Sequence, residues 1–288
     1  MQRSQVYKII DDILEGPCLI RALFGPRQVG KTTAAKQVVD KLKLPYIFES
    51  ADSPQPRTAD WITTHWNRAR KLASKEGSSV LVLDEVQKIP GWSEEVKRLW
   101  DKDRLDQRKV HVLILGSSAL LLQNGLTESL AGRFFLYRFF HWSWPEMKEA
   151  FGFSLEQWIF FGGYPGAAPF VSNQDQWKQY INDSLIETAI ARDVLSLKKI
   201  RKPALLRQLF GLCSAYPARI LSYNKMLGQL QDAGNTTTVA EYLVLLEHAF
   251  LACGLQGFSK GAVRKRASSP KILLLNNGLV SALSLIHI

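Results

Sequence analysis

Apolar residues along the chain form short runs that alternate with longer stretches of helical periodicity. The runs are rich in Val, Ile, Leu and Phe and end at glycine or at polar residues, as buried strands do. They are CLIRALFG (18–25), LPYIFES (44–50), SSVLVLDE (78–85), VHVLILGSS (110–118) and FFLYRFF (134–140). Strands that alternate with helices predict a mostly parallel sheet covered by helices, so we expect an α/β fold.

The alternation stops after about residue 141, and the rest of the chain predicts helices followed by two strands. The three helices are expected at Leu205–Ala215, Tyr223–Leu230 and Thr238–Phe250. The strands are expected within AFLACGLQGFS (249–259) and SSPKILLL (268–275), around a basic loop. This order is typical of a winged helix–turn–helix, so we predict such a domain here.

Charge separates the two parts of the chain. The 288 residues carry a formal net charge of +11, and residues 196–288 account for +9 of it, with 12 Lys and Arg against 3 Asp and Glu. Such an excess favours nucleic acid, an anionic ligand or an acidic partner. The three cysteines have no metal spacing, and we expect them to be reduced. No apolar run is long enough to span a membrane and no signal peptide is evident, which indicates a cytoplasmic protein without a membrane partner.

The strongest motif follows the first predicted strand. Residues 25–32, Gly25-Pro26-Arg27-Gln28-Val29-Gly30-Lys31-Thr32, fit the G-x-x-x-x-G-K-[ST] pattern of a phosphate-binding P-loop, and a helical stretch with Thr33 follows. Glycines let successive backbone N–H groups turn inward, and the helix adds its positive N-terminal end. Lys31 would reach the β- and γ-phosphates, and the Thr32 hydroxyl would bind Mg²⁺.

A second motif places two acids at the end of a buried strand. Val80-Leu81-Val82-Leu83 precedes Asp84 and Glu85. Ligands of open α/β sheets bind at the carboxyl ends of the strands. We therefore predict Asp84 as a Mg²⁺ ligand and Glu85 as the general base that polarises the attacking water.

Four further residues, two of them as alternatives, are candidates for contact with the γ-phosphate. Ser117, with Ser118 as the alternative, follows the strand at 110–116 and could lie between the phosphate and the water. Arg133, just before the strand at 134–140, could supply positive charge to this site or to that of a neighbouring subunit, or be an ordinary surface arginine. Arg192 is the weaker alternative.

The basic loop of the predicted winged helix carries candidate nucleic-acid contacts. They are Lys260, Arg264, Lys265 and Arg266. Lysine and arginine side chains in such a wing suit DNA phosphates. Asn235 would cap the helix that begins near Thr238. Winged helices also serve as protein-contact modules, so a protein partner is the alternative.

These motifs together resemble a family of bacterial and archaeal P-loop ATPases related to AAA+ proteins, in which an AAA_14 domain precedes a DUF4143 domain. The matching segments are GPRQVGKTT (25–33), LVLDEVQKIPGW (81–92), LILGSSALLL (113–122), ESLAGR (128–133), GGYPG (162–166), ARDV (191–194), TTTVAEYLVLLEHAFL (236–251) and SPKILLLNNGL (269–279). The resemblance implies ATP as the nucleotide. It also implies a nuclease-like last domain, but Asn276 stands where the family commonly has Asp, and the sequence stops soon afterwards at LSLIHI. We therefore infer no nuclease activity and expect a truncated tail.

Four segments are therefore predicted. They are a P-loop core of the ASCE/AAA+ type (1–145), a helical linker or lid region (146–202), a winged-helix-like domain (203–268) and the start of a truncated domain (269–288). We expect a Mg²⁺-dependent ATPase that couples hydrolysis to a switch of the basic domain. The alternatives are a nucleotide-gated DNA-binding regulator and a protein-interaction scaffold with little turnover. The oligomeric state is open, with a homo-oligomer among the candidates.

Overall fold

The computed structural model divides the chain into two compact units, Met1–Phe140 and His141–Ile288. Each is described by itself. The structure describes residues 3–116, 129–194, 200, 202–231, 234–257 and 269–284.

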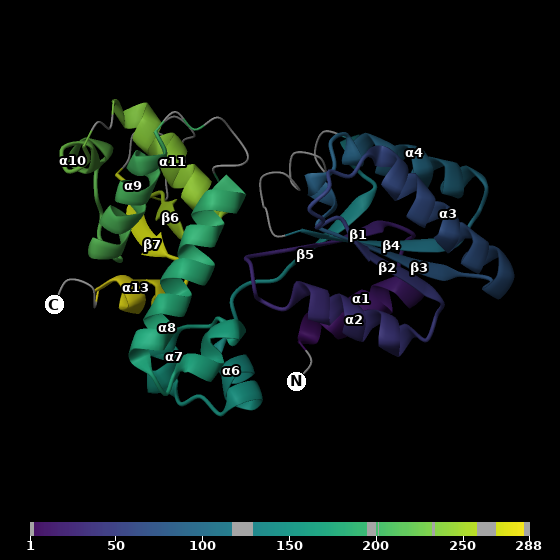
Figure 1. The fold of residues 1–288 in the computed structure, drawn as a ribbon, viewed down its shortest axis with the longest axis horizontal. Coiled ribbons are helices and arrows are strands. Elements are labelled where there is room, and N and C mark those ends of the chain that lie inside the picture. The colour runs from purple at the N-terminus through teal and green to yellow at the C-terminus, as the bar shows by residue number, and fades with distance from the viewer. Residues whose placement is uncertain are drawn as a thin grey trace. The chain divides into compact units, whose positions relative to one another are not determined.

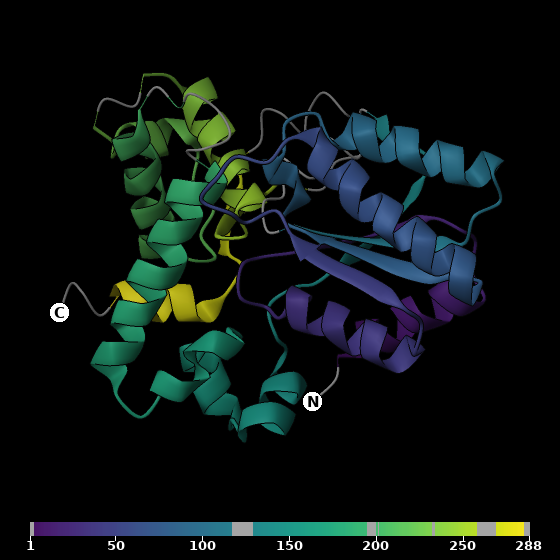
Figure 2. The same cartoon turned by 45° about the vertical axis from the view of Figure 1, so that its right-hand side comes forward.

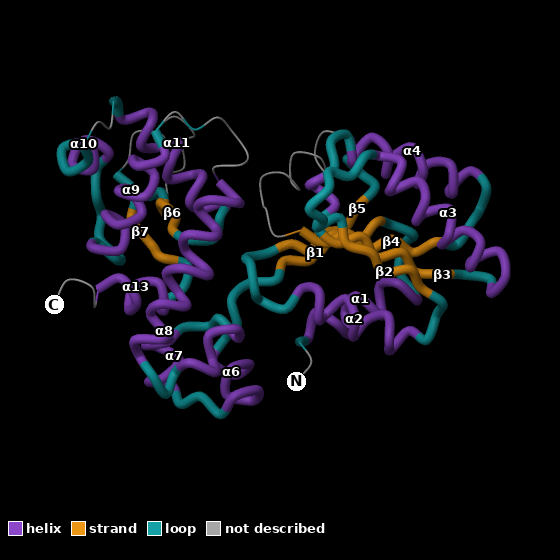
Figure 3. The backbone as a smooth tube through the Cα atoms, in the orientation of Figure 1, coloured by secondary structure: helices purple, strands orange, loops and turns teal. Residues whose placement is uncertain are grey.

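The first unit is built on a sheet of five parallel strands (Figures 1 and 3). Their order is β2-β3-β4-β1-β5, and every neighbouring pair is parallel. The strands are β1 (Ile20–Phe24), β2 (Tyr46–Ser50), β3 (Ser79–Asp84), β4 (Val110–Gly116) and β5 (Phe134–Arg138). All five coincide with the predicted apolar runs. Parallel pairing brings their carboxyl ends to one edge, which is where the loop after β1 and the acids after β3 lie.

Helices cover both faces of this sheet (Figure 2). One face carries α1 (Ser4–Leu14) and α2 (Lys31–Leu42), and the other carries α3 (Ala59–Glu76) and α4 (Trp92–Leu105). The core under α3 and α4 includes Trp66, Leu81 and Ile114, each without exposed surface. Central strands buried on both faces explain why their sequences are nearly continuous apolar runs.

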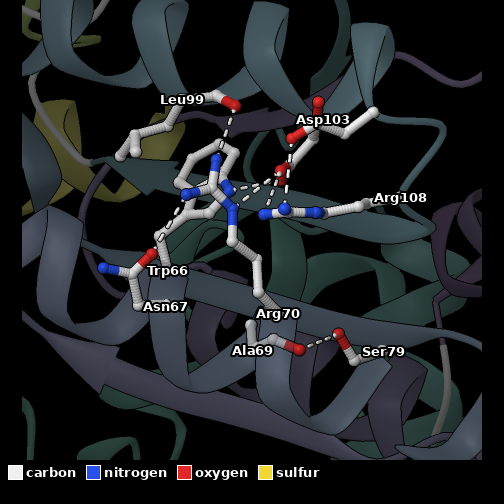
Figure 4. A network of polar contacts seen from close by, with 9 residues as sticks. Trp66, Asn67, Ala69, Arg70, Ser79, Leu99, Asp103 and Arg108 are labelled. Atoms are coloured by element: carbon white, nitrogen blue, oxygen red, sulfur yellow. Dashed lines mark hydrogen bonds and ion pairs between the residues drawn. The ribbon is translucent and has the colours of Figure 1, made fainter. Parts of the chain in front are cut away.

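A buried polar network joins α3 to α4 (Figure 4). Arg70 Nε lies 2.7 Å from Asp103 Oδ1, and its Nη2 donates to the Leu99 carbonyl at 3.0 Å. Trp66 Nε1 donates to the other oxygen of the same carboxylate at 2.6 Å. Arg108 approaches more loosely, at 3.9 Å, and is partly exposed. Because Asp103 and Arg70 are almost fully buried, each depends on the other for compensation of its charge.

His111 lies on β4 near the amino-end edge of the sheet. It lines a cavity of about 670 Å³ together with Ile13, Leu44 and Lys109. Its Nδ1 atom is buried and has no hydrogen-bond partner within the part of the chain that the structure describes. Burial, and then the charges of Arg21 and Lys109, lower the pKa of His111 to about 4. The imidazole is therefore neutral at physiological pH.

The second unit begins with short helices and one long irregular helix. The short helices are α6 (Trp144–Phe151) and α7 (Leu155–Phe161), each opened by a serine capping box, and they are followed by a 3₁₀ segment (Pro165–Phe170). The helix α8 (Gln174–Gln179) continues into π-helical segments at Tyr180–Ile186 and Ala189–Val194. The described part of residues 146–202 is thus mostly helical.

Three helices and two antiparallel strands follow in the predicted order. They are α9 (Pro203–Ala215), α10 (Tyr223–Leu227), α11 (Thr236–His248), β6 (Ala252–Leu255) and β7 (Lys271–Leu274). Ile220, between α9 and α10, adds an antiparallel bridge to Lys271. Asn235 caps α11 by accepting the Thr238 N–H at 2.9 Å, as expected. The last described helix, α13 (Asn277–Ser284), packs against α7 and α9.

The GGYPG segment (162–166) is a place of close backbone approach. Gly162 has φ 76°, and a Cβ there would lie 1.9 Å from Asn276 Oδ1. A Cβ on Gly163 would lie 2.0 Å from the Trp142 carbonyl oxygen. Asn276 in turn accepts the Gly278 N–H at 2.9 Å and so caps the start of α13. Both glycines and Asn276 therefore have packing roles within the second unit.

Candidate functional site

The loop between β1 and α2 has the shape of an anion cradle. Gln28 and Gly30 both have left-handed backbone conformations, with φ of 58° and 86°. Gly30 is the N-cap residue of α2 and, because it has no side chain, makes no side-chain cap. Left-handed turns at a helix start direct successive backbone N–H groups towards one point, where an anion binds. The loop therefore has a backbone shape that would suit a phosphate group, and phosphate binding by these residues stays a prediction.

Gly25, the first residue of the loop, is required by a close contact. A Cβ on Gly25 would lie 1.8 Å from the carbonyl oxygen of Phe139, which follows β5. The Phe139 N–H donates to the Phe24 carbonyl at 2.7 Å and so extends the pairing of β5 with β1 to the start of the loop. Any side chain at position 25 would force these two segments apart.

Lys31 reaches back over the loop. Its side-chain ammonium donates to the carbonyls of Gly25 at 2.9 Å and Pro26 at 2.6 Å, and the residue is only 8% exposed. These bonds hold a positive charge at the mouth of the cradle. Such a charge complements the phosphate oxygens that the cradle would bind.

Thr32 and Asp84 face each other across the site. The Thr32 hydroxyl donates to Asp84 Oδ2 at 2.8 Å, although the two residues belong to α2 and β3. Burial raises the pKa of Asp84, and the Thr32 hydrogen bond opposes that effect. The Glu85 charge raises this pKa further, and the Lys31 charge lowers it. A hydroxyl and a carboxylate are oxygen ligands of the kind that Mg²⁺ prefers, so the donor set fits this ion.

Glu85 is placed by an unusual backbone turn. It has φ 55°, and its N–H donates to the Leu115 carbonyl at the end of β4, at 2.9 Å. Non-glycine residues in this region are uncommon and cluster at functional sites. The side chain is half-buried beside Asp84. The predicted pair of acids therefore lies at the same sheet edge as the loop.

Gln87 is a site residue that the sequence analysis missed. Its Nε2 donates to Glu85 Oε2 at 2.6 Å, and the residue is only 6% exposed. Its Oε1 is buried and has no partner among the described residues. The left-handed turn at Glu85 and the 3₁₀ turn (Val86–Lys88) bring this amide back to the carboxylate. A polar residue two positions after the acid, inside an apolar segment, was the available signal.

Arg133 lies at the opposite edge of the sheet from the loop, so its predicted role in the site of its own chain is wrong. Its carbonyl accepts the Ile20 N–H at 2.9 Å, at the beginning of β1, whereas the loop follows the end of that strand. Strands rise by ~3.3 Å per residue, so the length of β1 alone separates the two by roughly 13 Å. Arg133 instead forms an ion pair with Asp101 at 2.8 Å and lies over the Trp100 ring.

Several predicted residues lie outside the described part of the chain. They are Ser117, Ser118 and the wing residues Lys260, Arg264, Lys265 and Arg266. The side chain of Arg192 also lies outside it. Within the described ranges, no group of three or more His, Cys, Asp or Glu could hold a metal ion. No described helix is both long and apolar enough to cross a membrane.

Comparisons with known proteins agree with this geometry. Residues 19–148 match the family model of an AAA domain, AAA_14. Residues 152–287 match a domain of unknown function, DUF8612, where we expected DUF4143. No curated protein sequence matches the chain.

Solved structures with a similar fold include the Walker-type ATPase Paby2304 of Pyrococcus abyssi. It has 14% sequence identity and a TM-score of 0.65, over 98% of this chain and 95% of that chain. The RuvB Holliday junction branch migration motor of Thermotoga maritima has 16% identity and a TM-score of 0.44, over 88% of this chain and 90% of that chain. Residues 19–148 therefore match an AAA domain, and the chain as a whole is similar in fold to the Walker-type ATPase Paby2304.

Proposed function

We propose that the protein is a Mg²⁺-dependent ATPase in which water attacks the γ-phosphate of ATP. The observation that carries this proposal is the hydrogen bond of 2.8 Å between Thr32 and Asp84, beside the buried ammonium of Lys31. It joins the helix after the P-loop to the acid at the end of β3. These two positions supply the metal ligands in the P-loop ATPase mechanism.

Binding is assigned to residues 25–33. The backbone N–H groups between Gly25 and Thr33 would receive the phosphates, and Lys31 would exchange its bonds to the loop carbonyls for phosphate oxygens. Thr32 and Asp84 would hold Mg²⁺. The ion, when bound, neutralises charge on the phosphate oxygens. Adenine is assigned because the AAA_14 match and the fold are those of ATPases.

Activation of water is assigned to Glu85. Its carboxylate lies at the phosphate edge of the sheet, and Gln87 occupies one of its oxygens, which leaves the other to accept a proton from water. Gln87 would thus set the orientation of the base. Ser117, which follows β4 in the sequence, stays a predicted contact of the γ-phosphate.

We further propose that hydrolysis changes the conformation of the second unit, whose residues 203–268 would form a winged helix. The order of α9, α10, α11, β6 and β7 supports this, and so does the strand-like bridge between Ile220 and Lys271. DNA would then be bound through the wing residues Lys260, Arg264, Lys265 and Arg266. Salt-dependent binding to any duplex, lost when the three wing residues 264–266 are replaced by Ala, tests that contact.

A protein partner is the second candidate, and the surface of α11 favours it. In a DNA-binding winged helix, the second helix of the motif lies in the major groove. The exposed positions of α11 include Glu241, Val244 and Glu247. Two carboxylates would repel DNA phosphates, whereas an exposed Val244 between them suits a protein surface.

Two variants test the proposed ATPase. Lys31→Ala should abolish binding of ATP, and retained affinity would remove the P-loop assignment. Glu85→Gln should bind ATP with Mg²⁺ but hydrolyse it at least ~100-fold more slowly, because a positioned base contributes about that factor or more. Turnover measured with and without duplex DNA, and with size-exclusion chromatography in parallel, separates an ATPase motor or switch from a slow nucleotide-gated regulator. Undiminished hydrolysis by Glu85→Gln would exclude this residue as the base.

A further inference from the structure

Arg3 is buried although it stands almost at the beginning of the chain. The residue is 6% exposed and lies just before α1. Its Nη1 contacts two backbone carbonyls, that of Val29 at 3.4 Å and that of Phe140 at 3.2 Å. Its guanidinium also lies 5.3 Å from the centre of the Phe139 ring. One cation thus contacts both the P-loop and the segment that follows β5.

The contact with Val29 bears on the orientation of a phosphate donor. In a trans peptide unit the C=O and the following N–H point in opposite directions. A cation that holds the Val29 carbonyl therefore turns the Gly30 N–H the other way, towards the concave side of the loop. Gln28 and Gly30, on either side of Val29, have the left-handed conformations that make this peptide unit face in that direction. Arg3 thus stabilises the outer side of the anion cradle.

The contact with Phe140 reaches the end of the first unit. Phe140 is the last residue of that unit, and the chain continues from it into the second. Its neighbour Phe139 already touches the first loop residue, because the Phe139 carbonyl packs against Gly25. Residues 139–140 are therefore linked to the P-loop at two points. Phe139 contacts Gly25 directly, and Phe140 is linked to Val29 through Arg3.

We propose that Arg3 is a positioning residue that holds the Val29–Gly30 peptide for phosphate binding and couples this peptide to the segment 139–140. The proposal rests on the proposed nucleotide binding and adds a route from the phosphate cradle to the connection between the units. Movement of the cradle on phosphate binding would shift the Val29 carbonyl, and Arg3 would pass that shift to the Phe140 carbonyl.

The test compares nucleotides that differ in how far they reach into the cradle. The dissociation constants of ADP and AMP are measured for the wild type and for Arg3→Gln. We expect ADP binding to weaken roughly tenfold, the value of about one hydrogen bond to a charged group, and AMP binding to change much less. Equal weakening of both nucleotides, or no weakening, would overturn the proposal.

Val6→Ala is the matched control for simple loosening of the N-terminus. Val6 is a fully buried residue of α1 without a contact to the loop in the described hydrogen bonds. The Val6→Ala substitution should lower the melting temperature and leave the ratio of the ADP to the AMP dissociation constant unchanged. If Val6→Ala raises the ratio of the ADP to the AMP dissociation constant as Arg3→Gln does, Arg3 acts only by anchoring the helix. Arg3→Lys keeps the positive charge, but the lysine side chain is not expected to reach the carbonyls of both Val29 and Phe140. Wild-type ADP affinity in Arg3→Lys would therefore also refute the proposed positioning role.

Hydrogen exchange tests the coupling. Amide exchange of a peptide that covers residues 139–142 should slow on ADP binding in the wild type and respond less in Arg3→Gln. An ADP-dependent change that is equal in both proteins would refute the coupling. If the wild type binds ADP and Lys31→Ala does not, the proposed function stands whatever Arg3→Gln does. If the wild type does not bind ADP, both proposals fail together.

Discussion

The Thr32 hydroxyl donates a hydrogen bond of 2.8 Å to the carboxylate of Asp84, which is 9% exposed at the end of β3. This bond compensates only part of the cost of burying the acid, because burial is the largest influence on the Asp84 pKa and raises it. The protein thus holds a carboxylate where its charge is unfavourable. A bound cation would relieve that cost.

Asp84→Asn should therefore separate stability from activity. A carboxyl group whose pKa is raised by folding stabilises the fold at low pH, and this contribution is lost as the pH rises through the folded-state pKa. At pH 7 the substitution removes an unfavourable buried charge, so the melting temperature should rise while Mg²⁺-dependent ATP hydrolysis is lost. Asp101→Asn, on the surface of α4, is the control and should not raise the melting temperature. A fall for Asp84→Asn would contradict this account.

Gln87→Ala should lower turnover more than substrate binding. The amide holds one oxygen of Glu85 and has no expected contact with the phosphates. We expect kcat to fall about tenfold, part of the effect of a general base, with KM for ATP nearly unchanged. Steady-state kinetics measure both quantities. Lys88→Ala, on the same turn but exposed, is the control; a rise in KM at constant kcat for Gln87→Ala would assign Gln87 to binding.

Arg133→Ala should leave the ATP affinity of its own chain unchanged, since Arg133 lies at the amino ends of the strands. The loss of its solvent-exposed ion pair with Asp101 should change the stability of the fold little, because solvent screens such pairs. Titration with a fluorescent ATP analogue checks the affinity. If hydrolysis falls only at protein concentrations where the chain self-associates, Arg133 serves a neighbouring subunit. A large loss of affinity in the monomer would refute the placement.

Asp103→Ala should be among the most destabilising single changes in the first unit. It leaves the buried guanidinium of Arg70 without its partner and removes the acceptor of Trp66 Nε1. Breaking a buried pair in this way costs about 3–5 kcal/mol. Chemical denaturation measures the loss. Arg108→Ala, which removes the looser contact of the same carboxylate and an exposed ion pair with Asp106, should cost no more than about 1 kcal/mol. Equal losses for both variants would show that burial does not determine the effect.

His111→Leu should reduce the sensitivity of the fold to acid. The folded-state pKa of about 4 lies below the ordinary 6.5, so the unfolded chain takes up the proton first. Stability from the neutral imidazole is present above pH 6.5 and is lost as the pH falls towards 4. Between these values the wild type should lose stability faster than the variant does. Parallel curves of unfolding free energy against pH would contradict the assignment.

The strands and the phosphate loop could be predicted because both are local patterns. Each run of apolar residues became a strand of the sheet, even CLIRALFG with its internal Arg21, whose guanidinium donates to the main-chain carbonyls of Asp12, Pro17 and Leu19. The edge on which Arg133 lies was also predictable in principle. A residue that precedes a parallel strand must lie opposite the loops that follow the strands.

Contacts between distant segments could not be predicted in this way. Nothing in the pattern of the first residues indicates that Arg3 reaches Val29 and Phe140, because both contacts depend on the order of the strands. Gln87 depends on a left-handed turn at Glu85, which propensity disfavours for a non-glycine residue. The strand order β2-β3-β4-β1-β5 itself is a result of tertiary packing.

The contact between Gly162 and Asn276 carries a consequence for the evolution of the second unit. The amide oxygen of Asn276 occupies the space that a side chain at position 162 would need, while it also caps α13. An Asp at position 276 could make the same cap, so Asn and Asp should exchange freely there among relatives. A side chain at 162 would also lie 2.7 Å from the backbone nitrogen of Gly278, and no change at position 276 removes that contact. Position 162 is therefore expected to stay glycine whichever of the two residues stands at 276, although 114 positions of the chain separate them.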